Sequence, residues 1–342
     1  MASVCPSTGR LLDHSTLGSP SHRSSELLLL APAPPEPGAG VQCFGEFRTR
    51  AEKEKLLTAA AESALPAQLP IWSLLHNQMD RIYNCSEVRF FAAPFEKPVF
   101  FFAFERHDKT YPILHFSSAV WPLDACLFKA ALCAFLAHVS RALASVREFL
   151  VSAEDGLLHL FTDVQREMLG GRFASRLAGS RDMSCFYASD SQMELAKQEK
   201  LEVPAGYVLD DLHECDALLV HGAWRNARDL QCTRDRIRHL PSACLRDVSD
   251  GVAASWAFAS NFGQLTAHFT EPSHRRRGLA AAVELAMMKQ FMRMGQRPFK
   301  YVASDNVPVL RSSLASPFYT LWRRDGEPVV YHFRFFSAAD DS

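Results

Sequence analysis

Residues 266–283 read TAHFTEPSHRRRGLAAAV, and this stretch decides how the carboxyl-terminal half is interpreted. The pattern predicts a strand that ends at Thr270, a loop with three consecutive arginines, and a glycine that opens a helix. The first turn of a helix has unpaired N–H groups and a partial positive charge, so it binds anions. Gly278 lacks a Cβ and lets a ligand approach the backbone. Arg275 to Arg277 add charged donors that suit phosphate oxygens, so the stretch predicts a pyrophosphate site.

Two common phosphate-binding motifs do not fit this stretch. A Walker A loop needs Gly-Lys followed by Ser or Thr, and the dinucleotide fingerprint needs three glycines. The structural alternative is a solvated basic start of a helix, which an arginine run alone would favour. The order of elements around the stretch favours the anion site instead.

The elements of this half follow a regular order. Residues 278–294 place apolar side chains at spacings of three and four, which predicts an amphipathic helix. Apolar and β-branched runs separated by polar turns predict strands on both sides of it. The expected elements are strands at 243–247, 252–259, 264–270 and 299–304, helices at 212–221, 227–240 and 307–314, and a closing hairpin of 318–323 with 329–336.

The amino-terminal half begins with a region of different composition. Residues 1–46 are rich in Ser, Pro, Gly and Ala and predict a disordered tail, with a mitochondrial presequence as the alternative. The aromatic run Phe100–Phe104 is expected to be a core strand, because no basic residues interleave with it. Further expected elements are helices at 52–64 and 72–83, strands at 88–93, 98–105 and 111–117, one or two helices in 123–150, a strand at 157–161 and a polar helix or linker at 192–200.

Composition excludes several classes of protein. The 342 residues include 37 basic and 38 acidic side chains, for a formal net charge of −1, so a nucleic-acid partner is not expected. The apolar stretch 128–139 is shorter than the roughly twenty residues that span a bilayer, so no membrane segment is expected. Nine cysteines without Cys-x-x-Cys spacing predict reduced thiols. His107-Asp108 and His213-Glu214 lack metal-ligand spacing, so no metal is expected.

At this point the sequence resembles a known superfamily. Arg275-x-x-Gly278-x-Ala280 resembles the R/Q-x-x-G-x-G/A signature of the GNAT acyltransferases, which binds the pyrophosphate of acyl-coenzyme A. An ordered set of further matches resembles the glycine N-acyltransferase family within it. These matches are Pro204-x-Gly206-Tyr207, Trp224, Leu240-Pro241-Ser242, Ser255-Trp256, Phe269-Thr270-x-Pro272-x-x-Arg275 and Asn306.

The resemblance implies a fold and a division into domains. It implies the α+β GNAT acyltransferase fold, a mixed, mostly antiparallel sheet flanked by helices and splayed between 264–270 and 299–304. It covers residues 200–336 well and 51–195 weakly, where the family has a second, degenerate acyltransferase-like domain. The expected division is a tail at 1–46, an amino-terminal α+β domain at 47–195 and an acyl-CoA-binding domain at 196–342.

The resemblance also implies a reaction and a site. An acyl group would pass directly from the acyl-CoA thioester to the amine of glycine or another amino acid. The residues implied to bind the coenzyme are Ala267, His268, Phe269 and Thr270 for the pantetheine, Arg275, Arg276, Arg277, Gly278, Leu279 and Ala280 for the pyrophosphate, and Asn306 for the pantetheine arm.

Two positions depart from the pattern of the family. The family's glutamate base corresponds to Gln264, which cannot accept a proton, and a common tyrosine acid corresponds to Ser313. Strand alternation would place Gln264, Thr266, His268 and Thr270 on one face, so His268 is a candidate base. A hydrogen-bonded structural histidine and a proton relay through water remain open alternatives.

The sequence is therefore compatible with three functions. The first is an acyl-CoA-dependent N-acyltransferase that acts on a small amine. The second is a CoA-binding protein that has lost catalysis, which the departures at Gln264 and Ser313 suggest. The third is a peptide N-acetyltransferase. The expected compartment is the cytoplasm or the mitochondrion, and the oligomeric state is left open.

Overall fold

The computed structural model describes residues 44–62, 66–107 and 109–338. Most of the predicted tail therefore lies outside the described residues. Its last three residues are ordered: Phe44 stacks on Phe91, and β1 (Gly45–Phe47) pairs with β2 (Ser86–Ala93). The predicted tail boundary at residue 46 is wrong, because aromatic side chains at the end of the tail find buried partners.

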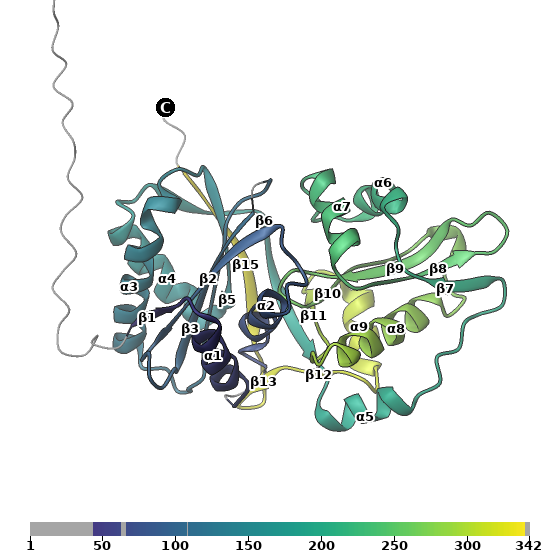
Figure 1. Ribbon diagram of the computed structural model, residues 1–342, viewed down its shortest axis with the longest axis horizontal. Coiled ribbons are helices and arrows are strands. Elements are labelled where there is room, and N and C mark those ends of the chain that lie inside the picture. The colour runs from purple at the N-terminus through teal and green to yellow at the C-terminus, as the bar shows by residue number, and fades with distance from the viewer. Residues whose placement is uncertain (1–43, 63–65, 108, 339–342) are drawn as a thin grey trace, which may run out of the picture. The chain divides into compact units, whose positions relative to one another are not determined.

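A nine-stranded sheet forms the framework of the first half (Figure 1). Its order is β1-β2-β3-β4-β5-β15-β6-β11, and β12 pairs with the end of β6 on the side opposite β11. All pairs are antiparallel except β4 with β5. The bounds of the remaining strands are β3 Phe100–His107, β4 Ile113–Ser118, β5 Glu148–Glu154, β6 Phe173–Tyr187, β11 Phe299–Ala303, β12 Thr320–Leu321 and β15 Val330–Ala338.

Helices cover both faces of this sheet. α3 (Ala125–Leu143) and α4 (Asp155–Met168) share a core with one face, and α1 (Arg50–Glu62) and α2 (Leu69–Met79) share a core with the other. Strands covered on both faces read as continuous apolar runs. Phe101 and Phe102 accordingly point into opposite cores, which confirms the run around them as a core strand.

A second, four-stranded antiparallel sheet has the order β10-β9-β8-β7. α8 (Leu279–Arg293) packs on one face, and α6 (Ala217–Ala223) and α7 (Leu230–His239) pack on the other. The predicted apolar stripe of α8 is confirmed, since Val283, Met287 and Phe291 are fully buried. The strands are β7 Tyr207–Asp210, β8 Ser242–Asp247, β9 Ala253–Ala259 and β10 Leu265–Thr270.

Two local predictions in the first half are wrong. The helix expected to extend to residue 150 ends at Leu143, and Glu148–Glu154 is the buried strand β5. The strand expected at 157–161 belongs to α4, because Leu157, Phe161 and Val164 recur at helical spacing and are all buried. A short apolar run does not by itself distinguish the spacing of a helix from that of a buried strand.

The predicted closing hairpin is also wrong. Only β13 (Arg323–Arg324) and β14 (Glu327–Pro328) pair with each other. β15 instead inserts between β5 and β6, and Figure 1 shows this yellow strand within the first sheet. The described residues form one compact unit, and its large sheet crosses the predicted boundary at 195. The division into two domains stays a prediction.

Among the described residues, α3 is long and apolar enough to cross a membrane by length and composition. The apolar stretch 128–139 is only the central part of this helix. Phe128, Leu132 and Phe135 on its inner face are fully buried against the sheet. Packing in the core accounts for its hydrophobicity.

Candidate functional site

β10 and β11 are the edge strands of the two sheets and do not pair with each other. β10 pairs with β9, and β11 pairs with β6. The predicted splay between these strands is therefore confirmed. The outer edge of β10 presents backbone groups that no described strand pairs with, so an extended ligand could hydrogen-bond there.

A β-bulge interrupts β10 at Ala267–His268. Thr266 pairs with Phe258 of β9. Phe269, three residues later, pairs with Trp256, only two residues back along β9. The extra residue shifts the alternation of side chains by one. Thr266 and Phe269 therefore share a face.

The prediction that Gln264, Thr266, His268 and Thr270 lie on one face is consequently wrong. A bulge reverses the side on which the later residues project. His268 and Thr270 lie on the face toward α8, and the hydroxyl of Thr270 bonds to that of Ser255. Gln264 and Thr266 lie on the other face and line a cavity that His268 does not reach.

His268 is enclosed between β10, α8 and β11. Burial lowers its pKa, and the carboxylate of Glu284 opposes this effect. Its Nε2 has no hydrogen-bond partner among the described residues. Beside it, Lys300 forms an ion pair with Glu284 and lies over the ring of Tyr319. His268 is thus neutral at pH 7 and belongs to a buried polar cluster.

The backbone at the start of α8 has the features expected of the predicted pyrophosphate site, Arg275–Ala280, which is called the cradle below. Gly278 is the N-cap residue with φ of 82° and ψ of −2°, and no side chain caps the helix. The N–H groups of the first turn therefore lack a side-chain acceptor. Leu279 is buried and anchors the turn, while Ala280 is exposed. A small anion can reach this backbone.

The three arginines of the loop are exposed and differently held. Arg275 donates from Nε to the carbonyl oxygen of Thr270 at 3.0 Å. Arg277 donates from Nη1 to the hydroxyl of Tyr207 at 2.8 Å. Arg276 has a φ of 61° and no described partner for its side chain. Two guanidinium groups are thus oriented beside the free edge of β10 and the start of α8.

Asn306 and Ser313 lie in the segment after β11. Asn306 is the N-cap residue of α9 (Val307–Ala315) without a side-chain cap bond, so its amide is available. Ser313, at the position of the family's tyrosine, is buried and its hydroxyl has no partner among the described residues. Tyr319 is also buried with an unpartnered hydroxyl, and burial raises its pKa well above the ordinary range.

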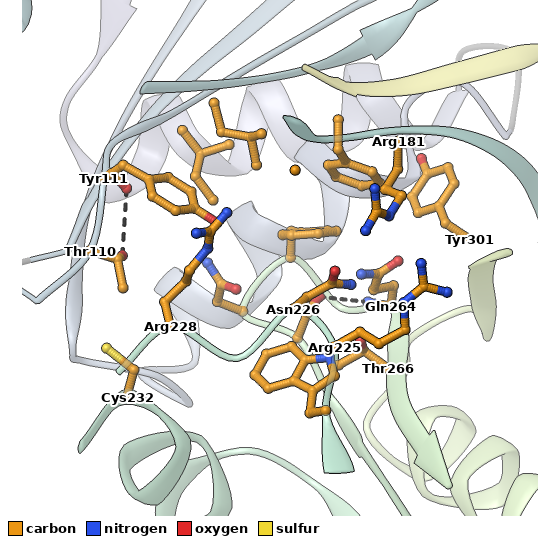
Figure 2. Close-up of a pocket in the computed structure, with 18 of the residues that line it drawn as sticks. Thr110, Tyr111, Arg181, Arg225, Asn226, Arg228, Cys232, Gln264, Thr266 and Tyr301 are labelled. Carbon is orange, nitrogen blue, oxygen red and sulfur yellow. Dashed lines mark hydrogen bonds between the residues drawn. The ribbon is translucent and has the colours of Figure 1, made fainter. Parts of the chain in front are cut away.

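A cavity of about 190 Å³ lies at the start of β10 (Figure 2). Its walls come from β6, β11 and β15 of the large sheet and from residues 224–236, which run from the end of α6 into α7. Gln264 lines it, and its Oε1 is buried without a hydrogen-bond partner. A buried acceptor atom without a partner can accept a hydrogen bond from an N–H group of a ligand.

Sequence reasoning missed the residues that come from the first half, among them Arg181, and the arginines of 224–236. They are far apart in the chain and share no motif. The only cysteine of the described lining is Cys232, and burial raises its pKa to about 11.

The turn that carries Gln264 is fixed by the first half of the chain. Asn77 donates from its side chain to the carbonyl oxygen of Asn261 at 2.7 Å, and Gln296 donates to Oδ1 of Asn77 at 2.6 Å. Asn261 in turn donates to the buried carboxylate of Glu105. Because each partner is buried, this network resists movement of the turn.

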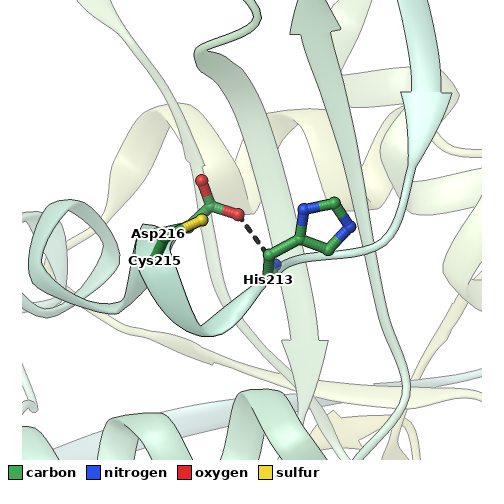
Figure 3. Close-up of side chains that lie close together, drawn as sticks. All are labelled: His213, Cys215 and Asp216. Atoms are coloured by element: carbon green, nitrogen blue, oxygen red, sulfur yellow. Dashed lines mark hydrogen bonds between the residues drawn. The ribbon is translucent and has the colours of Figure 1, made fainter.

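One group of potential metal ligands occurs among the described residues (Figure 3). The ligand atoms of His213, Cys215 and Asp216 lie within 4.8 Å of one another. The Asp216 carboxylate, however, accepts two hydrogen bonds from Arg246, at 3.0 and 2.6 Å, and one from the backbone of His213 at 2.8 Å. A metal would have to break this buried ion pair, so the geometry does not favour one.

The segment that contains β10, β11 and the start of α8 also matches a known family by sequence. Residues 244–311 match the family model described as FR47-like protein. This match covers about a fifth of the chain, from β8 into α9, and includes both edge strands. Together with the fold it supports the GNAT superfamily and does not distinguish a glycine N-acyltransferase.

Several solved structures are similar to this fold, some of them proteins described as GNAT acetyltransferases. A Drosophila protein is 16% identical, with a TM-score of 0.64 over 87% of this chain and 100% of that one. A tandem GNAT protein from the clavulanic acid biosynthesis pathway is 13% identical, with a TM-score of 0.47 over 87% and 99%. A GCN5-related N-acetyltransferase from Sphaerobacter thermophilus is 10% identical, with a TM-score of 0.47 over 85% and 95%. The predicted fold class is confirmed.

Proposed function

We propose that this protein is an acyl-CoA-dependent N-acyltransferase that acts on the amine of a small amino acid. The observation that carries the proposal is the adjacency of three features: a free strand edge, an uncapped helix start flanked by arginines, and a cavity lined by several arginines and Gln264. Acyl-CoA would supply the activated acyl group. The backbone of Ala267–Thr270 and the amide of Asn306 would hold its pantetheine, and Arg275–Ala280 its pyrophosphate.

The cavity at the start of β10 suits the acceptor. Its volume of about 190 Å³ is below the roughly 300–1,000 Å³ of pockets for drug-sized ligands, which favours a small amine over a peptide. Oε1 of Gln264 would accept a hydrogen bond from the amine and orient it. The amine nitrogen then bonds to the thioester carbonyl carbon, the carbon–sulfur bond breaks, and the proton lost by the amine is taken up by the thiolate or by water.

A carboxylate base is not needed if the amine enters uncharged. Four arginines line the cavity, and nearby positive charges lower the pKa of a bound ammonium group. Cys232 stays a thiol at pH 7, because burial raises its pKa to about 11. Direct transfer without a covalent enzyme intermediate is therefore the mechanism that we propose.

The test combines binding and turnover. Isothermal titration with CoA should give one site per chain. Arg276→Gln/Arg277→Gln should weaken CoA binding about tenfold or more, by loss of charge-assisted bonds. The exposed Arg141→Gln on α3 is the control. Release of free thiol from acetyl- or benzoyl-CoA should require an added amino acid. A flat CoA titration would refute the proposal.

A CoA-binding protein without catalysis is the second candidate. The absence of a carboxylate at Gln264 and of a tyrosine at Ser313 favours it. CoA binding with no thiol release from any acyl-CoA and amine pair would support this candidate over the first.

A further inference from the structure

The cavity at the start of β10 has an unusual charge balance. Arg181, Arg225, Arg228 and Arg236 line it, whereas Asp229 is the only acidic residue of its described lining. The Asp229 carboxylate already caps α7, where it accepts the N–H of Cys232 at 3.0 Å. The side chains that face the cavity therefore carry a clear positive excess.

Three of these arginines, Arg181, Arg228 and Arg236, lack an acidic partner among the described residues. Arg236 stacks with its guanidinium carbon 5.0 Å from the ring centre of Trp224. Arg181 donates only to the carbonyl oxygen of Ser180, at 2.9 Å. Arg228 stacks with its guanidinium carbon 5.0 Å from the ring centre of Phe335 and 5.7 Å from that of Tyr111. Arg225, in contrast, pairs with Asp305 at 3.4 Å.

Arg181 and Arg228 come from different halves of the chain. Arg181 lies on β6, and Arg228 lies in the segment before α7 (Figure 2). Stacking on aromatic rings fixes the plane of Arg228. The Tyr111 hydroxyl uses part of its N–H fork, and the other N–H groups can bind an anion. The unpartnered Oε1 of Gln264 lines the same cavity. The cavity thus offers two anion-binding groups and one amine-binding group.

We propose that the acceptor is an amine that carries two negative charges, such as an acidic amino acid. This inference rests on the proposed function and names the substrate class of the same cavity. A zwitterion with one carboxylate has no net charge and leaves one guanidinium unpaired. A second anionic group pairs both Arg181 and Arg228, while the amine meets Gln264. Two carboxylates or one phosphate can supply this charge.

The experiment titrates acceptors into the full-length protein saturated with CoA, which prevents turnover. L-glutamate is compared with L-glutamine, which differs in charge at nearly constant size, and O-phosphoethanolamine with ethanolamine, which lacks the phosphate group. The anionic member of at least one pair should bind roughly 10- to 100-fold tighter, as expected for hydrogen bonds to charged groups. The pair with the larger ratio identifies carboxylate or phosphate as the preferred anion.

Variants assign the preference to the two arginines. Arg181→Gln and Arg228→Gln should each reduce the ratio about tenfold or more, and Arg181→Lys should retain part of it. The exposed Arg141→Gln on α3 should leave it unchanged. Equal binding within both pairs, or no binding by either, overturns the inference. Normal CoA affinity in that experiment would leave the proposed function standing, whereas loss of CoA binding in the wild type would refute both.

Discussion

Gln264 and His268 project from opposite faces of β10, although they are four residues apart. The bulge at Ala267–His268 inserts one residue, so even spacing no longer means a shared face. Gln264 enters the cavity between the two sheets, and His268 enters the core under α8. The residue at the family's base position and the histidine that could replace it are therefore separated by the strand itself.

His268→Gln should leave the pH dependence of acyl transfer unchanged, because its ring does not line the acceptor cavity. Its effect should be on acid stability. Burial lowers the pKa of His268 below its ordinary 6.5, so the unfolded chain binds a proton that the folded chain does not. Stability should fall as pH drops below about 6.5, and less so in the variant. Urea unfolding between pH 7.5 and 5 measures the change in stability. Loss of the acidic limb of the pH–rate profile in the variant would contradict the expectation for catalysis.

Gly278→Ala should lower the free energy of unfolding by about 1–2 kcal/mol, the cost of a left-handed conformation with a Cβ. The nearest atom to the added Cβ is Cγ of Pro204 at 3.9 Å, so no clash contributes. CoA affinity should also fall, since the residue opens the cradle. Gly156→Ala on α4 is the matched control, with open space around it, and should be neutral or stabilising. An unchanged unfolding midpoint for Gly278→Ala would contradict the strain.

Lys300→Met should destabilise the protein by about 3–5 kcal/mol, because it leaves the partly buried Glu284 without its ion-pair partner. The double variant Lys300→Met/Glu284→Leu should recover much of that loss, since neither charge remains. Denaturant unfolding of the wild type, both single variants and the double variant gives the coupling between the two side chains. If the losses in free energy of unfolding of the two single variants add up to that of the double variant, the ion pair contributes nothing to stability.

Glu46→Gln should destabilise the protein near neutral pH and lose this effect in acid. Hydrogen bonds from Arg89 lower the pKa of Glu46 from 4.5 to about 2. A carboxyl with a lowered folded pKa stabilises above its unfolded pKa, and this contribution disappears as pH falls from about 4.5 toward 2. The free energies of unfolding of the wild type and the variant should therefore become equal as pH falls through that range. The exposed Glu87→Gln on the neighbouring strand is the control, and a gap that persists at pH 2 would argue against the ion pair.

A fragment of residues 44–195 should not fold alone. It lacks β15, which fills the space between β5 and β6, and β11, which covers the other edge of β6. Three strand edges, one of β5 and both of β6, would be unpaired and prone to aggregation. Near-ultraviolet circular dichroism should show no fixed tertiary structure, and coexpression with residues 196–342 should restore it. Cooperative folding of the isolated fragment would contradict this expectation.

Local patterns in the sequence predicted much of the carboxyl-terminal half. The apolar stripe of α8, the strands β8 to β11 and the glycine at the helix start follow from side-chain period and capping, which act between neighbours in the chain. The same rules were insufficient for the short apolar run at 157–161, since a few residues fit either period until packing selects one.

The sequence alone determined the GNAT-like order of elements and the arginines and glycine of the cradle, because both depend on residues that follow one another in the chain. Only the tertiary structure decided which residues meet in the cavity, that Gln264 and His268 separate, and that β15 completes the first sheet. The physical reason is that the bulge depends on how β10 pairs with β9, and that β15 pairs with strands far away in the chain; no propensity of the residues themselves encodes either.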